Sequence, residues 1–213
     1  MKRVFILKAS TARTDNKFTI KDLPGSSGRI DLACRCILAA LLTSRSHRTD
    51  TIFYAVLDGP PKPPLTIEID GEKIEQLPRN ELQLGLLLRQ ILNPSASSPI
   101  PPGFRMVEKG FRDIVEEQAD SSEIYFLHRS GRHIDDTLRS FEKLEKLRLA
   151  FILGDHIGLS QGDIEYLTSR GIKPLSLGPK EYLGSHCIFL VHERLDRVLG
   201  YRIAQRKGPK NAH

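Results

Sequence analysis

The sequence contains few cysteines and no cluster of metal-binding residues. Three cysteines occur in 213 residues, and an odd, small number argues against a disulfide framework. Cys34 and Cys36 stand two residues apart, a spacing that directs them to different faces of a helix. No group of His and Cys residues has the spacing of a zinc site. We therefore expect neither a disulfide framework nor a metal centre.

Long apolar runs are also missing. No stretch approaches the roughly 20 apolar residues that a membrane span needs. The apolar stretch behind the basic N-terminus covers only Val4 to Leu7, which is too short for the core of a signal peptide. Hydrophobic residues still make up 39% of the chain, so the composition is not that of a disordered protein. We expect a cytoplasmic protein without a membrane span.

Three widespread binding and catalytic motifs are absent. The chain has no GxGxxG, no GxxxxGK[ST] and no GxSxG. These absences disfavour a Rossmann dinucleotide site, a P-loop for phosphates and a hydrolase nucleophile elbow, in that order.

Positive charge is in modest excess and is concentrated near the two ends of the chain. The formal net charge is +6, which fits a nucleic-acid partner. Against a single acid, Asp15, the first 21 residues contain Lys2, Arg3, Lys8, Arg13, Lys17 and Lys21. The basic tail 202–213 contains no acid. Charge runs are more often a solvated surface, so both interpretations stay open.

Apolar periodicity predicts strands that alternate with helices. The predicted strands cover 4–8, 51–57, 123–128, 148–153 and 172–177. The predicted helices cover 30–42, 79–92, 104–118, 135–144, 160–170 and 185–199. This alternation is typical of an α/β protein with a mainly parallel sheet and helices on both faces.

Two segments interrupt the alternation. Residues 65–77 alternate apolar and polar side chains around Asp70 and Gly71, which predicts a small β-hairpin insertion. Residues 93–103 are rich in Pro and Ser and predict a mobile loop or an insertion.

Three predicted strands in the second half end in unusual turns. The strand at 123–128 ends with Leu127 and His128, the strand at 148–153 leads into Gly154, and the strand at 172–177 leads into 176–187. Parallel neighbours bring such ends to one edge of a sheet, where ligands bind. Glycine at that edge allows a ligand to approach the backbone closely.

The side chains at these turns suit a flat, partly apolar ligand such as adenosine. Leu127, Leu177 and Tyr182 would line the site beside free backbone amides and carbonyls. The simpler alternative is an ordinary strand-to-helix turn at Gly154, with Ser160 capping the next helix and the two leucines in the core.

Short segments along the chain, taken together, resemble one family. "LGDHIGL" at 153–159, "LSLGP" at 175–179 and "HCI" at 186–188 are similar to the cofactor region of SPOUT methyltransferases. "FILKA", "DLPGSSGRIDLACRC" and "IFYAVLDGPPKPP" in the first third resemble the archaeal TrmY family. That family methylates N1 of pseudouridine in the T-loop of tRNA. The resemblance runs from Val4 to about Tyr201, and the tail beyond it carries no motif.

The resemblance implies a fold and an assembly that composition cannot show. A single SPOUT domain would span 1–213, with 177–187 forming the loop of a C-terminal trefoil knot. True knots are nearly absent from proteins, so nothing else in the sequence predicts one. The resemblance also implies a homodimer. The last helix has more apolar residues than one buried face requires, which agrees with a dimer. These residues are Cys187, Ile188, Leu190, Val191 and Leu195.

The cofactor implied by the resemblance is S-adenosylmethionine, bent into the knot. Its contacts carry over to Leu127, Gly154, Leu177, Gly178, Pro179, Lys180, Glu181, Tyr182 and Cys187. Without the resemblance, Cys187 would be interpreted as a small buried residue at a helix start. A nucleophilic role for Cys187 is disfavoured because methyl transfer from sulfur to nitrogen is direct.

The implied reaction needs a general base for the acceptor nitrogen and side chains that bind the RNA. Pseudouridine N1 is a poor nucleophile until its proton leaves, and the candidate general base is Asp58, with Asp155 and His156 as weaker candidates. The alternative for Asp58 is a turn-forming Asp before Gly. The candidates for holding RNA phosphates are Arg29, Arg35, Arg13 and Lys17, each with a plain surface role as its alternative. Asp31 is expected to orient Arg29 or Arg35.

Two other functions fit the same residues. One is the same reaction on a ribosomal RNA pseudouridine, as in the related Nep1 proteins. The other is a knotted RNA-binding protein that has lost catalysis and need not retain the methyl donor.

Overall fold

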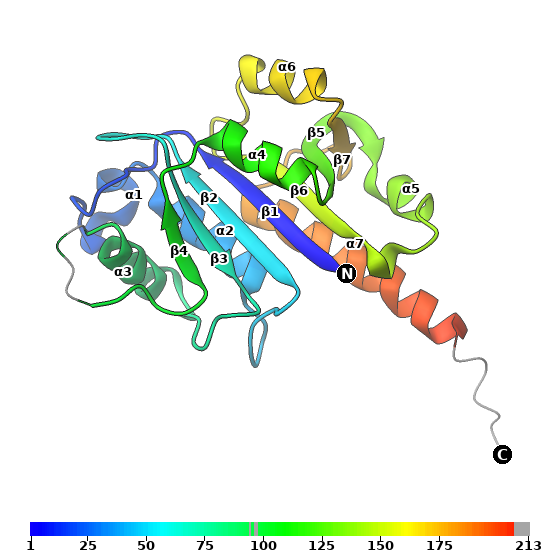
Figure 1. Cartoon of the computed structure of the whole chain (residues 1–213), viewed down its shortest axis with the longest axis horizontal. Coiled ribbons are helices and arrows are strands. Elements are labelled where there is room, and N and C mark those ends of the chain that lie inside the picture. Colours follow the sequence, from blue (N-terminus) through cyan, green and yellow to red (C-terminus); the bar gives the residue numbers. More distant parts are fainter. Residues whose placement is uncertain (94, 96–97, 207–213) are drawn as a thin grey trace.

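The structure is a computed structural model that describes residues 1–93, 95 and 98–206, the last six as backbone only. It contains one seven-stranded sheet between two layers of helices (Figure 1). The strands are β1 (Lys2–Ala9), β2 (Thr51–Leu57), β3 (Leu65–Asp70), β4 (Phe104–Val107), β5 (Glu123–His133), β6 (Arg148–Gly154) and β7 (Lys173–Ser176). The α-helices are α1 (Leu23–Ser26), α2 (Ile30–Leu41), α3 (Glu81–Ile91), α4 (Phe111–Ala119), α5 (Ile134–Arg139), α6 (Gln161–Ser169) and α7 (Gly184–Arg206), with short 3-10 turns at Ile20–Asp22 and Leu144–Lys146.

The sheet is mostly parallel, as the alternation of elements predicts. Its strand order is β4-β3-β2-β1-β6-β5-β7. β3 runs antiparallel to both of its neighbours, and the other paired strands run parallel. The carboxyl ends of β1, β2, β5, β6 and β7 therefore meet at one edge of the sheet.

Two hydrophobic layers cover the two faces of the sheet. Successive side chains of a strand point to opposite faces, so Phe5 and Leu7 of β1 pack on the side of α2 and α7, while Val4 and Ile6 pack on the side of α4. Figure 1 shows α4 and α6 over one face and α2 and α7 over the other. β2 is buried along its whole length, as is typical of a parallel strand covered on both faces.

A polar contact fixes the last helix to the centre of the sheet. Arg3 of β1 lies 2.8 Å from Nδ1 of His192 and donates to Asp196 at 2.5 Å, both on α7. Nε2 of the same histidine lies 3.0 Å from the carbonyl oxygen of Ala40 on α2. Burial, with help from Arg48 and Arg3, lowers the pKa of His192 to about 3. The imidazole is therefore uncharged in the folded protein near neutral pH.

The predicted hairpin at 65–77 is wrong. β3 ends at Asp70, and both of its edges are already occupied by β2 and β4, so a hairpin partner has no place. Residues 71–77 contain no strand. Gly71 instead allows the backbone at Arg48 to lie close to it, because a Cβ at Gly71 would lie 2.0 Å from the carbonyl oxygen of Arg48.

The predicted helix at 104–118 is also partly wrong. Phe104–Val107 forms β4, which pairs with the free edge of β3, and only Phe111–Ala119 is helical. The loop predicted to be mobile at 93–103 is described only in part, because residues 94, 96 and 97 lie outside the described residues. Of the basic tail, 202–206 continue α7, and 207–213 lie outside the described residues. None of the described helices has both the length and the apolar character of a membrane span.

Candidate active site

A cavity of about 950 Å³ lies at the edge where the parallel strands end. Its walls come from the middle of β5, the loop after β6, the segment between β7 and α7, and residues 29–35 at the start of α2. Of the residues predicted to contact the cofactor, the structure brings these to its lining: Leu127, Gly154, Leu177, Gly178, Lys180, Glu181, Tyr182 and Cys187. Pro179 does not line it. The convergence expected from the strand ends is therefore present.

Gly154 lines this cavity, and the loop that follows folds back onto it. A Cβ at Gly154 would lie 2.3 Å from the carbonyl carbon of Gly158 and 2.6 Å from the amide nitrogen of Leu159. Real Cβ atoms do not approach a backbone so closely, so the loop between 155 and 159 could not keep this position above any other residue.

Asp155 fixes that loop. Its amide donates to the carbonyl oxygen of Lys8 at 3.1 Å. Its carboxylate accepts from the amides of Ser10 at 2.7 Å and Ile157 at 2.9 Å, and its side chain is only 2% exposed. These contacts engage both carboxylate oxygens, which argues against Asp155 as the base. His156 lines the cavity 3.7 Å from the same carboxylate.

Cys187 lies in the first turn of α7 and is partly buried. Its amide donates to the carbonyl oxygen of Leu183 at 2.9 Å, and its Sγ contacts the carbonyl oxygen of Tyr182 at 3.6 Å. Burial raises the pKa of the Cys187 thiol to about 11. The thiol is protonated near neutral pH, which agrees with the expectation that it is not a nucleophile.

Asp58 does not line the cavity. It follows β2, and its amide donates to the carbonyl oxygen of Ala9 at 3.1 Å. β1 separates β2 from β6 in the sheet, which corresponds to a lateral distance of about 10 Å. Burial raises the pKa of Asp58, and the nearby Lys8 opposes that rise.

A charged cluster beside Asp58 was not predicted from the sequence. Nζ of Lys8 lies 2.7 Å from Asp163 on α6 and 3.8 Å from Asp58. Asp163 also forms a capping box with Ser160 at the start of α6. Although burial opposes the change, hydrogen bonds from Lys8 and Ser160 lower the pKa of Asp163. The S-x-x-D pattern at 160–163 signals the cap, but nothing in the sequence signals the contact with Lys8.

Two of the four predicted RNA-binding residues reach the cavity. Arg29, which directly precedes α2, and Arg35 within that helix line it, and both pair with Asp31, as expected. Arg13 lies outside the lining and forms a two-pronged ion pair with Asp15 at 2.7 and 2.8 Å. Lys17 is exposed in the same loop and also lies outside the lining.

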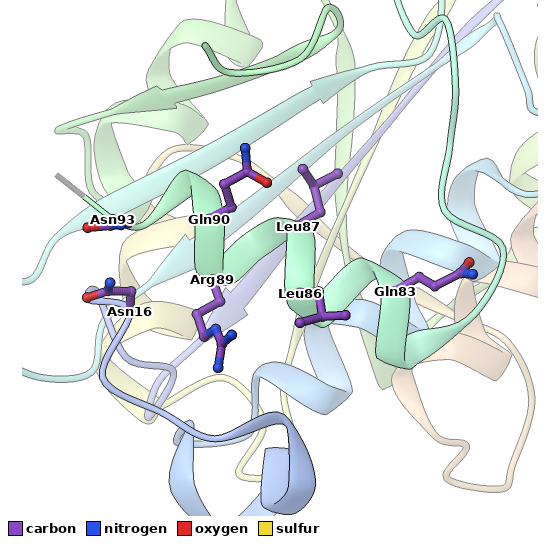
Figure 2. Close-up of a pocket in the computed structure, with 7 residues that line it drawn as sticks. All are labelled: Asn16, Gln83, Leu86, Leu87, Arg89, Gln90 and Asn93. Carbon is purple, nitrogen blue, oxygen red and sulfur yellow. The ribbon is translucent and has the colours of Figure 1, made fainter. Parts of the chain in front are cut away.

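A second, shallower hollow of about 630 Å³ lies between α3 and the loop at Asn16 (Figure 2). Its lining consists of Asn16, Gln83, Leu86, Leu87, Arg89, Gln90 and Asn93. None of the predicted site residues lines it, and no parallel strand ends there. Among the described residues, no group of three or more His, Cys, Asp or Glu side chains is placed to hold a metal ion.

The fold has a solved representative. The structure of Archaeoglobus fulgidus Nep1 bound to S-adenosylhomocysteine superposes with a TM-score of 0.60, at 18% identity, over 94% of this chain and 100% of that one. At this identity the match shows a shared fold.

Sequence comparison identifies the family. Residues 2–199 match the family described as putative SAM-dependent RNA methyltransferases. A tRNA (pseudouridine(54)-N(1))-methyltransferase of Methanococcus aeolicus is 38% identical over 91% of this chain and 97% of its own length. One from Pyrococcus abyssi is 37% identical over 92% and 98%. The chain belongs to this RNA methyltransferase family, and the resemblance inferred from its motifs is confirmed.

Proposed function

We propose that the protein transfers a methyl group from S-adenosylmethionine to N1 of pseudouridine 54 in tRNA. The observation that carries the proposal is the cavity in which the cofactor residues of the motifs lie beside Arg29 and Arg35. The names of the M. aeolicus and P. abyssi relatives specify pseudouridine 54 as the nucleotide and N1 as the methylated atom. A tRNA substrate also favours a cytoplasmic location.

The residues around the cavity fit the cofactor. A volume of about 950 Å³ lies within the range of small-molecule sites. Leu127, Leu175 and Leu177 provide apolar walls for an adenine ring. Gly154, where a Cβ has no room, allows the loop at 155–159 to pack against the end of β6 and to line the cavity. When bound, the cofactor supplies an activated methyl group on a positively charged sulfur.

Methyl transfer then depends on placing the acceptor nitrogen in line with that methyl group. The target base must leave its stack, at a cost of a few kcal/mol. Asp58 is the proposed acceptor of the N1 proton. Burial raises the pKa of Asp58 toward the working pH, which suits a general base. For Asp58 to take the proton, N1 itself must lie over the end of β1, with the methyl group on its β6 side and the Asp58 carboxylate on its β2 side. These two strands are about 10 Å apart.

The active form is proposed to be a homodimer with a knotted C-terminal segment at 177–187. Large apolar side chains are exposed near the cavity: Ile157 at 63%, Leu183 at 67% and Phe189 at 64%. A second copy of the chain would cover them. The apolar residues of the last helix that first suggested a dimer are in part core residues instead, because Ile188, Val191 and Leu195 are fully buried within the protomer.

The test is methyl transfer from labelled S-adenosylmethionine to two RNAs in competition. One is a tRNA with pseudouridine at position 54, and the other is a ribosomal RNA helix with a pseudouridine in its loop. Preferential labelling of the tRNA supports the proposal. Preferential labelling of the ribosomal RNA overturns the tRNA assignment. Failure to bind S-adenosylmethionine, measured by calorimetry, would favour a binding protein without catalysis.

A further inference from the structure

One buried carboxylate holds two arginines at the wall of the cavity. Asp31, in the first turn of α2, is 1% exposed. Its Oδ1 accepts from Nε of Arg29 at 3.0 Å and its Oδ2 accepts from Nη2 at 3.2 Å, so the two side chains meet in a fork. Nη2 of Arg35, one turn further along the helix, donates to the same Oδ2 at 2.6 Å. Both arginines belong to the lining of the cavity.

The backbone at Arg29 is in a conformation that arginine rarely adopts. Its φ is 76°, and among the described residues it is the one residue other than glycine with a positive φ. Gly28 before it is also left-handed, with φ 64°, and has no room for a side chain because a Cβ would lie 1.9 Å from the carbonyl oxygen of Thr11. Two consecutive left-handed residues thus precede α2, and the side chain of the second one pairs with Asp31. Strained residues of this kind cluster at functional sites.

The arginines remain open to solvent although Asp31 does not. The side chains of Arg29 and Arg35 are 36% and 45% exposed. Each guanidinium has five N–H donors, so the pairing with Asp31 leaves donors on both arginines free. The group of three carries one net positive charge. Glu81, 3.7 Å from Nη1 of Arg35, is the other carboxylate paired with this group.

We propose that Asp31 is a positioning residue for RNA: it holds Arg29 and Arg35 as a preformed clamp for a backbone phosphate next to the target nucleotide. This inference rests on the proposed function for the nature of the ligand. Paired, planar donors match the oxygens of a phosphate. The partial exposure of both guanidinium groups suits a ligand that arrives from outside. Asp31 does not touch the RNA and acts through the two arginines.

The direction in which Asp31→Asn changes RNA affinity distinguishes a positioning role from an effect of net charge alone. Removing a negative charge from a protein ordinarily strengthens its binding to a polyanion. Asp31→Asn is isosteric and removes one negative charge, so net charge alone predicts tighter RNA binding. A clamp that depends on Asp31 predicts weaker binding instead, because both arginines lose their fixed position.

The experiment measures binding of a fluorescein-labelled T-arm hairpin with pseudouridine by anisotropy, over a series of salt concentrations. Glu68→Gln is the matched control, since Glu68 is 16% exposed, holds Arg105 by two hydrogen bonds, and lies on β3 outside the cavity lining. Asp31→Asn is expected to raise the Kd about 10-fold at 0.1 M salt and to lower the slope of log K against log salt by about one to two. Glu68→Gln should leave both unchanged or bind slightly tighter.

A second variant keeps the test valid if Asp31→Asn unfolds. Arg29→Gly suits the left-handed backbone and removes one arm of the clamp, so it is expected to fold and to weaken RNA binding. In the background of Arg29→Gly and Arg35→Gln, Asp31→Asn should have no further effect on the Kd. An additive loss there would show that Asp31 does not act through the arginines and would overturn the inference.

The remaining outcomes separate this inference from the proposed function. If Asp31→Asn binds RNA like Glu68→Gln, or binds it more tightly, the positioning role is wrong while methylation of tRNA by the wild type still stands. If Asp31→Asn instead weakens binding of S-adenosylmethionine in calorimetry and spares RNA, the clamp holds the cofactor carboxylate and the RNA assignment is wrong. If the wild type methylates no pseudouridine-containing RNA, the proposed function falls. The anisotropy data still test the clamp in that case.

Discussion

Gly154→Ala should damage the cofactor site through a single methyl group. The Cβ would lie 2.3 Å from the carbonyl carbon of Gly158, 2.6 Å from its oxygen and 2.6 Å from the amide nitrogen of Leu159. All three are backbone atoms, so no side-chain rotation can relieve the contact. The loop at 155–159, which contributes five consecutive residues to the cavity lining, has to move.

The size of the effect follows from the contact distances. Ordinary contact requires a Cβ to stand 3.4–4 Å from such atoms, so the loop must shift by about 1 Å or more. Overpacking of this kind typically costs 1–3 kcal/mol of folding free energy. The shift also strains the hydrogen bonds that Asp155 makes to Ser10 and Lys8. If the binding free energy of S-adenosylmethionine is reduced by the same amount, its Kd rises roughly 5- to 150-fold.

Calorimetry with S-adenosylmethionine and urea denaturation measure the two effects. Gly162→Ala is the matched control, because the atom nearest to its Cβ is Oγ of Ser160 at 4.0 Å and the site lies in α6 outside the lining. That variant should bind normally and be as stable as the wild type or slightly more so. Gly154→Ala with an unchanged Kd would refute the assignment of this cavity to the cofactor.

Three further predictions concern the base, the assembly and a buried histidine. Asp58→Asn should lower kcat by about 10²–10⁴ at neutral pH without changing cofactor affinity, and the deficit should shrink at higher pH; a deficit independent of pH argues against a general base. Light scattering should give twice the 24.0 kDa of the chain, and Phe189→Glu should give a monomer; a monomeric wild type contradicts the dimer. His192 has a pKa of about 3 when folded and 6.5 when unfolded, so the unfolded chain binds its proton first and stability falls as pH decreases below 6.5. Between pH 7 and pH 5, His192→Gln should therefore lose about 2 kcal/mol less stability than the wild type in urea denaturation; equal losses would show that the histidine does not remain neutral.

The sequence predicts that Leu127, Gly154 and Leu177 come together because parallel neighbouring strands end at one edge of a sheet. Gly154 ends β6 and Leu177 follows the end of β7. Leu127 instead stands just after Phe126, where the pairing of β5 with β6 stops, because the strand predicted to end at 128 continues through an irregularity to His133. Apolar periodicity is enough to predict that sheet, because β2 and the centre of β6 are buried on both faces.

Edge strands and side-chain networks could not be predicted in the same way. Phe104–Val107 has one buried, two exposed and one half-buried residue, which is too little pattern in four residues to separate a strand from a helix. The alternation at 65–70 is real, but the partners of β3 lie in distant segments rather than across Gly71. The contact between Lys8 and Asp163 joins residues 155 positions apart and has no local signal.

A comparison of two RNAs tests whether the acceptor is N1 of pseudouridine. The protein is incubated with S-adenosylmethionine and with T-arm hairpins that are identical except for pseudouridine or uridine at position 54, and the digested nucleosides are identified by mass spectrometry. Uridine has its glycosidic bond at N1 and offers no proton there. We expect N1-methylpseudouridine from the first RNA and no methylated nucleoside from the second. Methylation of the uridine-containing RNA, or a methyl group at another atom of pseudouridine, would contradict this assignment.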